Sequence, residues 1–310
     1  MTNSAGIHHV TAICSDPKRN VAFYTRGLGL RLVKKTVNFD DPGTWHLYYG
    51  DETGRPGTAL TFFAWKQSTP GRNGNGMATE TAFVIPEGSL GYWTHRLVEQ
   101  DIAHDAPEKR FGESVLPLRD DDGMRLALVA TKDAGQIPGW SNGEIPAEHA
   151  IRGFHGVTLM VDAGERTAQV LTSTFGFKAH RRDGNLARFR ADGDRLGQVV
   201  DVRTAGGFLA GRQGAGSVHH VAFRAADDTA QAQMAATLAA EGLHPTDQRN
   251  RCYFRSVYFK EPGGVLFEIA TDDPGFTLDE PKETLGSAIK LPPWFESRRA
   301  EIESALPPLV

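Results

Sequence analysis

Residues 7–65 alternate between short apolar segments and turn-forming stretches in a fixed order. An apolar segment at 7–13 is followed by Asp16 and Pro17, which are typical of the N-cap and first position of a helix. Three further segments of strand character, separated by turn-like stretches at 40–43 and 54–57, are 31–39, 46–49 and 58–65. This pattern predicts one strand, one helix and three strands, which together make a βαβββ module.

The same order of elements recurs three times later in the chain, at 79–131, 154–203 and 218–271. One module leaves a face of its sheet uncovered, so modules should pair and enclose a cleft suited to a small molecule. We therefore predict an α+β fold of four βαβββ modules in two paired-module domains. The first domain would occupy 1–136 and the second 152–271.

The remaining segments lack the repeat. The connection at 137–151 is rich in Gly, Pro and polar residues and is the predicted boundary between the domains. The C-terminal tail, 272–310, contains a predicted short charged helix at 296–304. We expect this tail to pack on the domains, and a role in covering the cleft is the alternative.

Composition and charge exclude several classes of protein. With 34 Lys and Arg against 38 Asp and Glu, the formal charge is −4, which gives no basic surface for nucleic acid. The chain has no apolar run of the roughly 20 residues that a membrane span needs, and its first residues lack a secretion signal. Cys14 and Cys252 make no disulfide framework. We expect a cytoplasmic homo-oligomer that binds small molecules, without nucleic-acid or membrane partners.

Two histidine doublets stand at matching positions of the first and fourth modules. One doublet is His8-His9, and the other is His219-His220. Glu268 lies within an apolar strand of the fourth module, where a carboxylate needs a partner that offsets its desolvation. Because successive residues of a strand point to opposite faces, only one member of each doublet can reach a metal, and we choose the second member of each.

The candidate ligands His9, His220 and Glu268 have consequences for chemistry and for topology. Two histidines and one carboxylate on one side of a metal, with open positions opposite, form the ligand set of non-haem Fe(II) oxygenases. These residues can meet only if the first module pairs with the fourth, which leaves the second to pair with the third. There Glu80 matches a histidine position and Asp201 loosely matches Glu268. We expect these two acids to be solvated rather than to bind a hard cation.

Longer motifs extend this pattern over most of the chain. They are HHVT at 8–11, LGLRLVKKTVNFDD at 28–41, YYGD at 48–51, PGT at 56–58, HH at 219–220, NR at 250–251 and PGGVLFE at 262–268. With these motifs, and with Gly-Phe and Leu-Gly pairs in the tail, the chain resembles the hydroquinone-type ring-cleaving dioxygenases. That family is part of the vicinal oxygen chelate superfamily, also called the glyoxalase/bleomycin resistance/dioxygenase superfamily.

The resemblance implies the vicinal oxygen chelate fold and a dioxygenase that opens the ring of hydroquinones or catechols with O2. It implies that Fe(II), or Mn(II) as the alternative, is bound by His9, His220 and Glu268, which agrees with the choice made above. It also implies roles close to the metal or the substrate for five further residues, His8, Thr11, His219, Arg251 and Tyr258.

Two other functions are compatible with this fold. A glyoxalase-like lyase or isomerase that uses Zn(II) or Ni(II) needs a carboxylate from each of two paired modules, and the last strand of the first module offers none. A metal-free protein that binds quinones or other aromatic compounds would be expected to have a broken ligand set, whereas all three ligand positions are filled. An assay of bound metal would separate the three functions.

Overall fold

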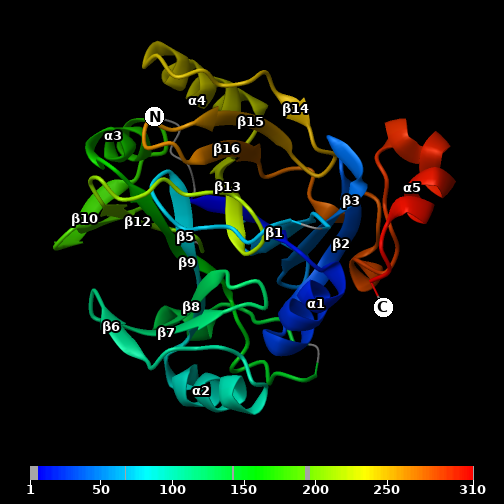
Figure 1. Cartoon of the computed structure of the whole chain (residues 1–310), viewed down its shortest axis with the longest axis horizontal. Coiled ribbons are helices and arrows are strands. Elements are labelled where there is room, and N and C mark those ends of the chain that lie inside the picture. The colour runs from blue at the N-terminus through cyan, green and yellow to red at the C-terminus, as the bar shows by residue number, and fades with distance from the viewer. Residues whose placement is uncertain (1–5, 67, 142, 193–195, 310) are drawn as a thin grey trace.

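Two eight-stranded sheets make up the computed structural model of the chain, which describes residues 6–66, 68–141, 143–192 and 196–309 (Figure 1). Each sheet contains two βαβββ modules, so the predicted α+β fold of four modules is confirmed. In each module the first and last strands run parallel and side by side. The other two strands extend the sheet in antiparallel fashion.

The first sheet joins the first and fourth modules. The first module supplies β1 (Ile7–Cys14), α1 (Pro17–Ala22), β2 (Arg31–Asn38), β3 (Asp41–Gly50) and β4 (Ala59–Ala64). The fourth module supplies β13 (Ser217–Ala225), α4 (Asp228–Ala240), β14 (Arg249–Asn250), β15 (Arg255–Lys260) and β16 (Leu266–Thr271). The strand order is β14-β15-β16-β13-β1-β4-β3-β2, and the antiparallel pair β1–β13 is the seam between the two modules.

The second sheet joins the second and third modules. The second module supplies β5 (Met77–Pro86), α2 (Leu90–Glu99), β6 (Glu108–Arg110), β7 (Glu113–Arg119) and β8 (Arg125–Thr131). The third module supplies β9 (Gly153–Val161), α3 (Glu165–Ser173), β10 (Lys178–Asp183), β11 (Leu186–Arg190) and β12 (Val199–Thr204). The antiparallel pair β5–β9 is its seam. Each sheet thus takes one module from each half of the sequence, as the ligand set required, and the boundary at 137–151 stays a prediction.

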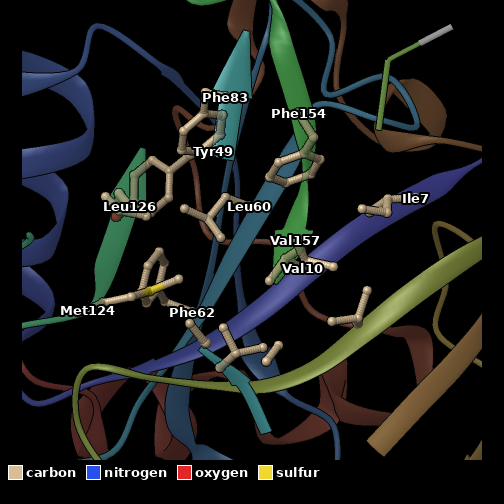
Figure 2. Close-up of a cluster of buried hydrophobic side chains, with 14 of the residues drawn as sticks. Ile7, Val10, Tyr49, Leu60, Phe62, Phe83, Met124, Leu126, Phe154 and Val157 are labelled. Carbon is tan, nitrogen blue, oxygen red and sulfur yellow. The ribbon is translucent and has the colours of Figure 1, made fainter. Parts of the chain in front are cut away.

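The largest hydrophobic core lies between the two sheets. Figure 2 shows Val10 and Leu60 of the first sheet in the same cluster as Phe83 of the second. Burial of side chains of this size stabilises the fold by about 1.5–3 kcal/mol each. Because side chains alternate along a strand, His9 and Thr11, the neighbours of Val10, face the other side of the first sheet. The core between the sheets therefore places polar residues of β1 on the opposite face, where the candidate site lies.

Two local predictions differ from the structure. The turn predicted at 40–43 is wrong, because β2 and β3 join through Phe39 and Asp40 alone: Asn38 pairs with Asp41, and Asp40 N donates to Asn38 Oδ1 at 3.0 Å. The helix predicted at 296–304 is a 3-10 helix at Pro293–Arg298 followed by α5 (Arg299–Ala305). In the part of the chain that the structure covers, no helix has the length and apolar character needed to cross a membrane.

The C-terminal tail lies against the first module (Figure 1). Lys34 on β2 is fully buried, and its Nζ lies 2.5 Å from Asp279 Oδ1 and 2.5 Å from Glu280 Oε2, both in the tail. A buried ammonium group needs such partners to offset its desolvation. Gly286 (φ +74°) approaches β2 so closely that a Cβ there would lie 1.9 Å from Leu32 O. The tail is therefore fixed to β2 by buried charges and by close backbone contact.

A buried polar contact links the first module to the second. Tyr24 OH donates to Asp120 Oδ2 at 2.9 Å, and the N–H of Met124 donates to Asp120 Oδ1 at 2.8 Å. Burial raises the pKa of Asp120 from 3.8 to about 6, because the loss of solvation outweighs these hydrogen bonds. The folded protein therefore binds a proton at Asp120 more readily than the unfolded chain does.

We predict that Asp120→Asn alters how stability depends on pH. Asp120 adds most to the free energy of unfolding below about pH 4. This contribution is lost as pH rises through about 6, by at most about 1.4 kcal/mol per pH unit. Urea unfolding of both proteins at pH 4 and pH 7 measures the effect. The wild type should lose more stability than the variant between these two values, and equal losses would contradict the prediction.

Candidate metal centre

Three buried side chains meet at the seam of the first sheet. His9 on β1, His220 on β13 and Glu268 on β16 come from three neighbouring strands. His220 Nε2 lies 2.9 Å from Glu268 Oε2 and 3.4 Å from His9 Nε2, and His9 Nε2 lies 3.3 Å from Glu268 Oε2. All three side chains are at most 4% exposed. The structure thus brings together the three ligands predicted from the sequence.

The spacing of these three atoms fits a single metal ion. Ligand atoms about 2.1 Å from a metal and at right angles to one another lie about 3.0 Å apart, close to the three distances observed. Glu268 Oε2 is buried beside both imidazoles, yet its contacts lack hydrogen-bond geometry and it has no other partner among the residues described. A cation between the three atoms would satisfy this oxygen. The three residues therefore fit a metal, which we call the metal triangle.

Each histidine doublet lies in a β-bulge. The register of the β1–β13 seam shifts at His8 and at His219, so each is an extra residue on its strand. The bulge brings His8 Nδ1 within 2.9 Å of His9 Nδ1, and His219 Nδ1 within 2.8 Å of His220 Nδ1. The prediction that the two members of a doublet face opposite sides is therefore wrong, although only the second members join the metal triangle. Each first member thus contacts the ring of the candidate ligand beside it, and contacts of this kind orient the ligands of metal sites.

Charge and hydrogen bonding prepare the centre for a cation. Ser256 on β15 donates to Glu268 Oε1 at 2.5 Å, which leaves Oε2 for the metal triangle. Burial alone would raise the pKa of Glu268, but His9 and His220 hold it well below its usual range. Burial lowers the pKa of His220 and lowers that of His219 to about 3. At neutral pH the centre therefore offers a carboxylate and a neutral imidazole, the protonation states that bind metals.

Other predicted site residues line the pocket above the metal triangle. Thr11, Arg251 and Tyr258 line its inner part, and His219 lines its outer part. Arg251 Nε lies 3.3 Å from Tyr258 OH, and Arg251 Nη2 lies 2.9 Å from Asp40 Oδ2. Asp40 belongs to the turn between β2 and β3, whereas Arg251 and Tyr258 belong to the fourth module. The ion pair of Arg251 therefore connects the two modules across the pocket.

The inner and outer parts of the pocket differ in size. The inner part is a cavity of about 30 Å³, and the outer part is a cavity of about 340 Å³. Because a water molecule needs roughly 10–15 Å³ of such volume, the inner part holds a few water-sized groups. The outer part has apolar walls formed by Phe63, Trp65 and Leu266. The inner part thus suits the exchangeable ligands of a metal, and the outer part suits an aromatic ring.

Sequence reasoning missed three polar residues of the first module, His46, Tyr48 and Thr61. His46 Nδ1 lies 2.9 Å from Tyr48 OH, and His46 Nε2 lies 2.9 Å from Thr61 Oγ1. Thr61 Oγ1 lies 2.8 Å from Thr11 Oγ1. Alternation along β3 and β4 was the available signal, because it places these residues on the face opposite to the core. That signal becomes specific only when the pairing of β4 with β1 is known.

The strand register identifies the residue of each module that matches Glu268. Glu268 pairs with Ala222 of β13, which in turn pairs with His9 across the seam. In the first module, the partner of His220 across the seam is Thr11, and Thr11 pairs with Thr61. In the second sheet, the corresponding pairs lead to Ala127 in the second module and to Asp201 in the third. The first module thus has a hydroxyl where the fourth has its carboxylate, which confirms that it offers no acidic ligand.

At the corresponding place in the second sheet, arginines take the place of a metal. Arg188 Nε lies 2.8 Å from Asp201 Oδ1, and Arg110 forms an ion pair with Glu80. Asp201 is 4% exposed and the side chain of Glu80 is 13% exposed, so the expectation that these acids are solvated is wrong. Gly156 matches His220, and a Cβ at this position would lie 2.1 Å from a carbonyl oxygen of β12. The second sheet therefore has neither the ligands nor the space for this metal centre.

Comparison with known proteins identifies related sequences. The Glyoxalase/Bleomycin resistance protein/Dioxygenase superfamily matches residues 6–128 and 153–269. The chain is 43% identical to the provisionally named ring-cleaving dioxygenase MhqO of Bacillus subtilis, over 98% of this chain and 96% of that protein. It is 34% identical to the chlorohydroquinone/hydroquinone 1,2-dioxygenase of Sphingobium indicum, over 96% of this chain and 94% of that protein.

Solved structures agree with this relationship. The crystal structure of a provisionally named dioxygenase from Bacillus subtilis is 41% identical, with a TM-score of 0.94 over 100% of this chain and 99% of that one. Glyoxalase I from Zea mays shares the fold, with a TM-score of 0.65 at 15% identity over 86% of this chain and 92% of that one. The chain therefore belongs to the ring-cleaving dioxygenases of the Glyoxalase/Bleomycin resistance protein/Dioxygenase superfamily.

Proposed function

We propose that this chain is a non-haem Fe(II) dioxygenase that cleaves the ring of hydroquinones with O2. The observation that carries the proposal is the metal triangle of His9, His220 and Glu268, buried beneath a pocket with room for an aromatic ring. Three protein ligands would leave the remaining positions of a bound ion open to substrate and O2. We choose hydroquinones over catechols as the proposed substrates because the relative from Sphingobium indicum is named for hydroquinone. Mn(II) is the alternative metal.

The residues around the metal triangle divide the work of binding and orientation. Bound there, Fe(II) would activate O2 beside a substrate oxygen and favour the anionic form of that oxygen. Arg251 brings a positive charge to the inner pocket, where it can bind an oxygen that carries negative charge. Burial raises the pKa of Tyr258, so its phenol keeps its proton at neutral pH and can donate to the same oxygen. His8 and His219 hold the ligand imidazoles through Nδ1.

The alternative functions have less support from the site. A glyoxalase-like lyase moves a proton between two carboxylates, one from each module, and the first module has Thr61 at that position. A protein that only binds aromatic compounds has no need for two imidazoles that converge on a buried carboxylate oxygen without a hydrogen-bond partner. The intact ligand set with a single acid therefore favours the dioxygenase.

We predict that His220→Ala and Glu268→Gln each abolish binding of Fe(II), because each removes one of three ligands. Anaerobic titration calorimetry with Fe(II) measures the stoichiometry, with one ion expected per wild-type chain. Asp201→Asn is the matched control, since Asp201 holds the position of Glu268 in the second sheet. It should bind iron normally, although it should lower Tm because Arg188 loses its buried partner. Wild-type affinity in either ligand variant would exclude this metal centre.

We predict that Ser256→Ala weakens iron binding by about 10- to 100-fold without abolishing it. Ser256 fixes Glu268 through Oε1, and loss of an outer partner of a ligand typically has an effect of this size. Competition between the protein and a chelator gives the two dissociation constants. An affinity equal to that of the wild type would show that the hydroxyl does not orient the carboxylate.

We predict that the iron-loaded protein consumes one O2 for each hydroquinone opened. Anaerobic reconstitution with Fe(II), followed by oxygen-electrode assays on substituted hydroquinones and catechols, tests the reaction and the preference between the two classes. Product analysis by mass spectrometry should show both oxygen atoms of ¹⁸O2 in the opened ring. Preference for Zn(II) with isomerisation of a thiol adduct would support the lyase, and tight aromatic binding without a metal would support a binding protein.

A further inference from the structure

A continuous chain of hydrogen bonds runs along the wall of the pocket that the first module provides. It leads from Tyr48 OH to His46 Nδ1, from His46 Nε2 to Thr61 Oγ1, and from Thr61 Oγ1 to Thr11 Oγ1. The three contacts measure 2.9, 2.9 and 2.8 Å, respectively. Both ends, Tyr48 and Thr11, line the inner pocket. We call this arrangement the Tyr48–Thr11 chain.

Each member of the Tyr48–Thr11 chain is uncharged at neutral pH. Burial lowers the pKa of His46 well below its ordinary value, and the nearby His9 and His220 add to this shift. Burial raises the pKa of Tyr48, so the phenol keeps its proton. A neutral imidazole has one N–H and one bare nitrogen, so His46 can donate to one neighbour while it accepts from the other.

The chain therefore has two arrangements of its protons. In the first, Tyr48 donates to His46 Nδ1, His46 Nε2–H donates to Thr61, and Thr61 donates to Thr11, which leaves the hydroxyl proton of Thr11 free for the pocket. In the second, every bond is reversed, and Tyr48 instead has the free proton. The two arrangements share the same heavy-atom positions, so their exchange requires no movement of the backbone.

We propose that the Tyr48–Thr11 chain transfers a proton from one end of the inner pocket to the other. A group in the pocket gives a proton to the Tyr48 oxygen, each link passes its own proton to the next, and Thr11 gives one to an acceptor. Every link gains one proton and loses one, so no charge is left in the buried wall, where it would be costly. Reversal of all the bonds carries a proton in the opposite direction.

Ring cleavage gives this transfer a use, a consequence that rests on the function proposed above. A substrate hydroxyl loses its proton when its oxygen binds a metal as an anion, and an oxygen of the opened ring must gain one. Thr11 lies two residues from the ligand His9, and Tyr48 lines the inner pocket together with Arg251 and Tyr258. The chain thus connects two points of the wall around the same inner pocket.

The first test locates the proton of His46 in the metal-free protein by nitrogen-15 NMR of labelled histidine. In Thr61→Val, Nε2 loses its partner, so the proton should reside on Nδ1 and be donated to Tyr48. In Tyr48→Phe, Nδ1 loses its partner, so the proton should reside on Nε2 and be donated to Thr61. A proton on the same nitrogen in both variants would show that the surroundings fix His46, and it would overturn the proposal. Either variant alone still tests one direction if the other does not fold.

The second test compares kinetics of the iron-loaded enzyme. Thr61→Val should lower kcat at least about tenfold with KM unchanged, as for the loss of a proton-transfer group, and Thr61→Ser should restore it. The dependence of kcat on the fraction of D2O should change from curved, for several moving protons, to linear in Thr61→Val. Thr36→Val is the matched control, because Thr36 pairs with His46 across β2 and β3 and its hydroxyl has no partner among the residues described.

Each outcome has a defined meaning. An unchanged kcat in Thr61→Val, or an equal loss in Thr36→Val, would overturn the role of the chain in catalysis. If the iron-loaded wild type opens no hydroquinone or catechol, the proposed function fails, and the NMR test on the metal-free protein still decides whether the chain exchanges its protons. The two proposals can therefore fail independently.

Discussion

The buried carboxylate of Glu268 is the constraint on which the first sheet depends. It is fully buried on a central strand, where an uncompensated charge costs several kcal/mol. Its own module supplies Ser256 and His220, but the second imidazole, His9, comes from the first module. Both imidazoles reach the acid only when β1 pairs with β13, so the same contact that prepares a metal site also joins the first module to the fourth.

The second sheet shows how the same fold meets this constraint without a metal. Its seam has the register of the first, and an acid, Asp201, stands at the position of Glu268. The charge is offset there by the guanidinium of Arg188, which also forms an ion pair with Glu113. One chain thus contains two solutions to the burial of a carboxylate on this strand. The function belongs to the residues placed on the fold and not to the fold itself.

The parts of the structure that were predictable from the sequence follow from periodicity and from the ligand set. The four modules appear as repeats of apolar segments, and the need to bring His9 to Glu268 gives the pairing of the modules. The bulges were not predictable, because a histidine doublet looks the same in a regular strand and in a bulged one. Their effect is chemical, since only the bulge allows His8 and His219 to reach the ligand rings.

Residues such as His46 and Lys34 show a second limit, which is set by long-range contacts. His46 is an ordinary polar residue of an alternating strand until β4 brings Thr61 beside it. Lys34 is likewise a polar residue beside an apolar one, Val33. Nothing near Lys34 in the sequence indicates that its ammonium group will be buried against Asp279 and Glu280. Such positions depend on partners that are distant in sequence, and pattern alone does not select those partners.

The position of Thr61 bears on the choice between dioxygenase and lyase. With a carboxylate there, the two modules would present an acid on each side of the metal, and each acid could act as a base. A threonine removes one base and provides a hydroxyl that can accept a hydrogen bond while it donates another. Because His46 lies on one side of it and Thr11 on the other, this hydroxyl extends the wall's hydrogen bonding from Tyr48 to the pocket beside His9. The first module thus has an uncharged, hydrogen-bonded hydroxyl at the position where the fourth module has a carboxylate. This difference suits a reaction in which a metal, and not a second carboxylate, favours the anionic form of the substrate.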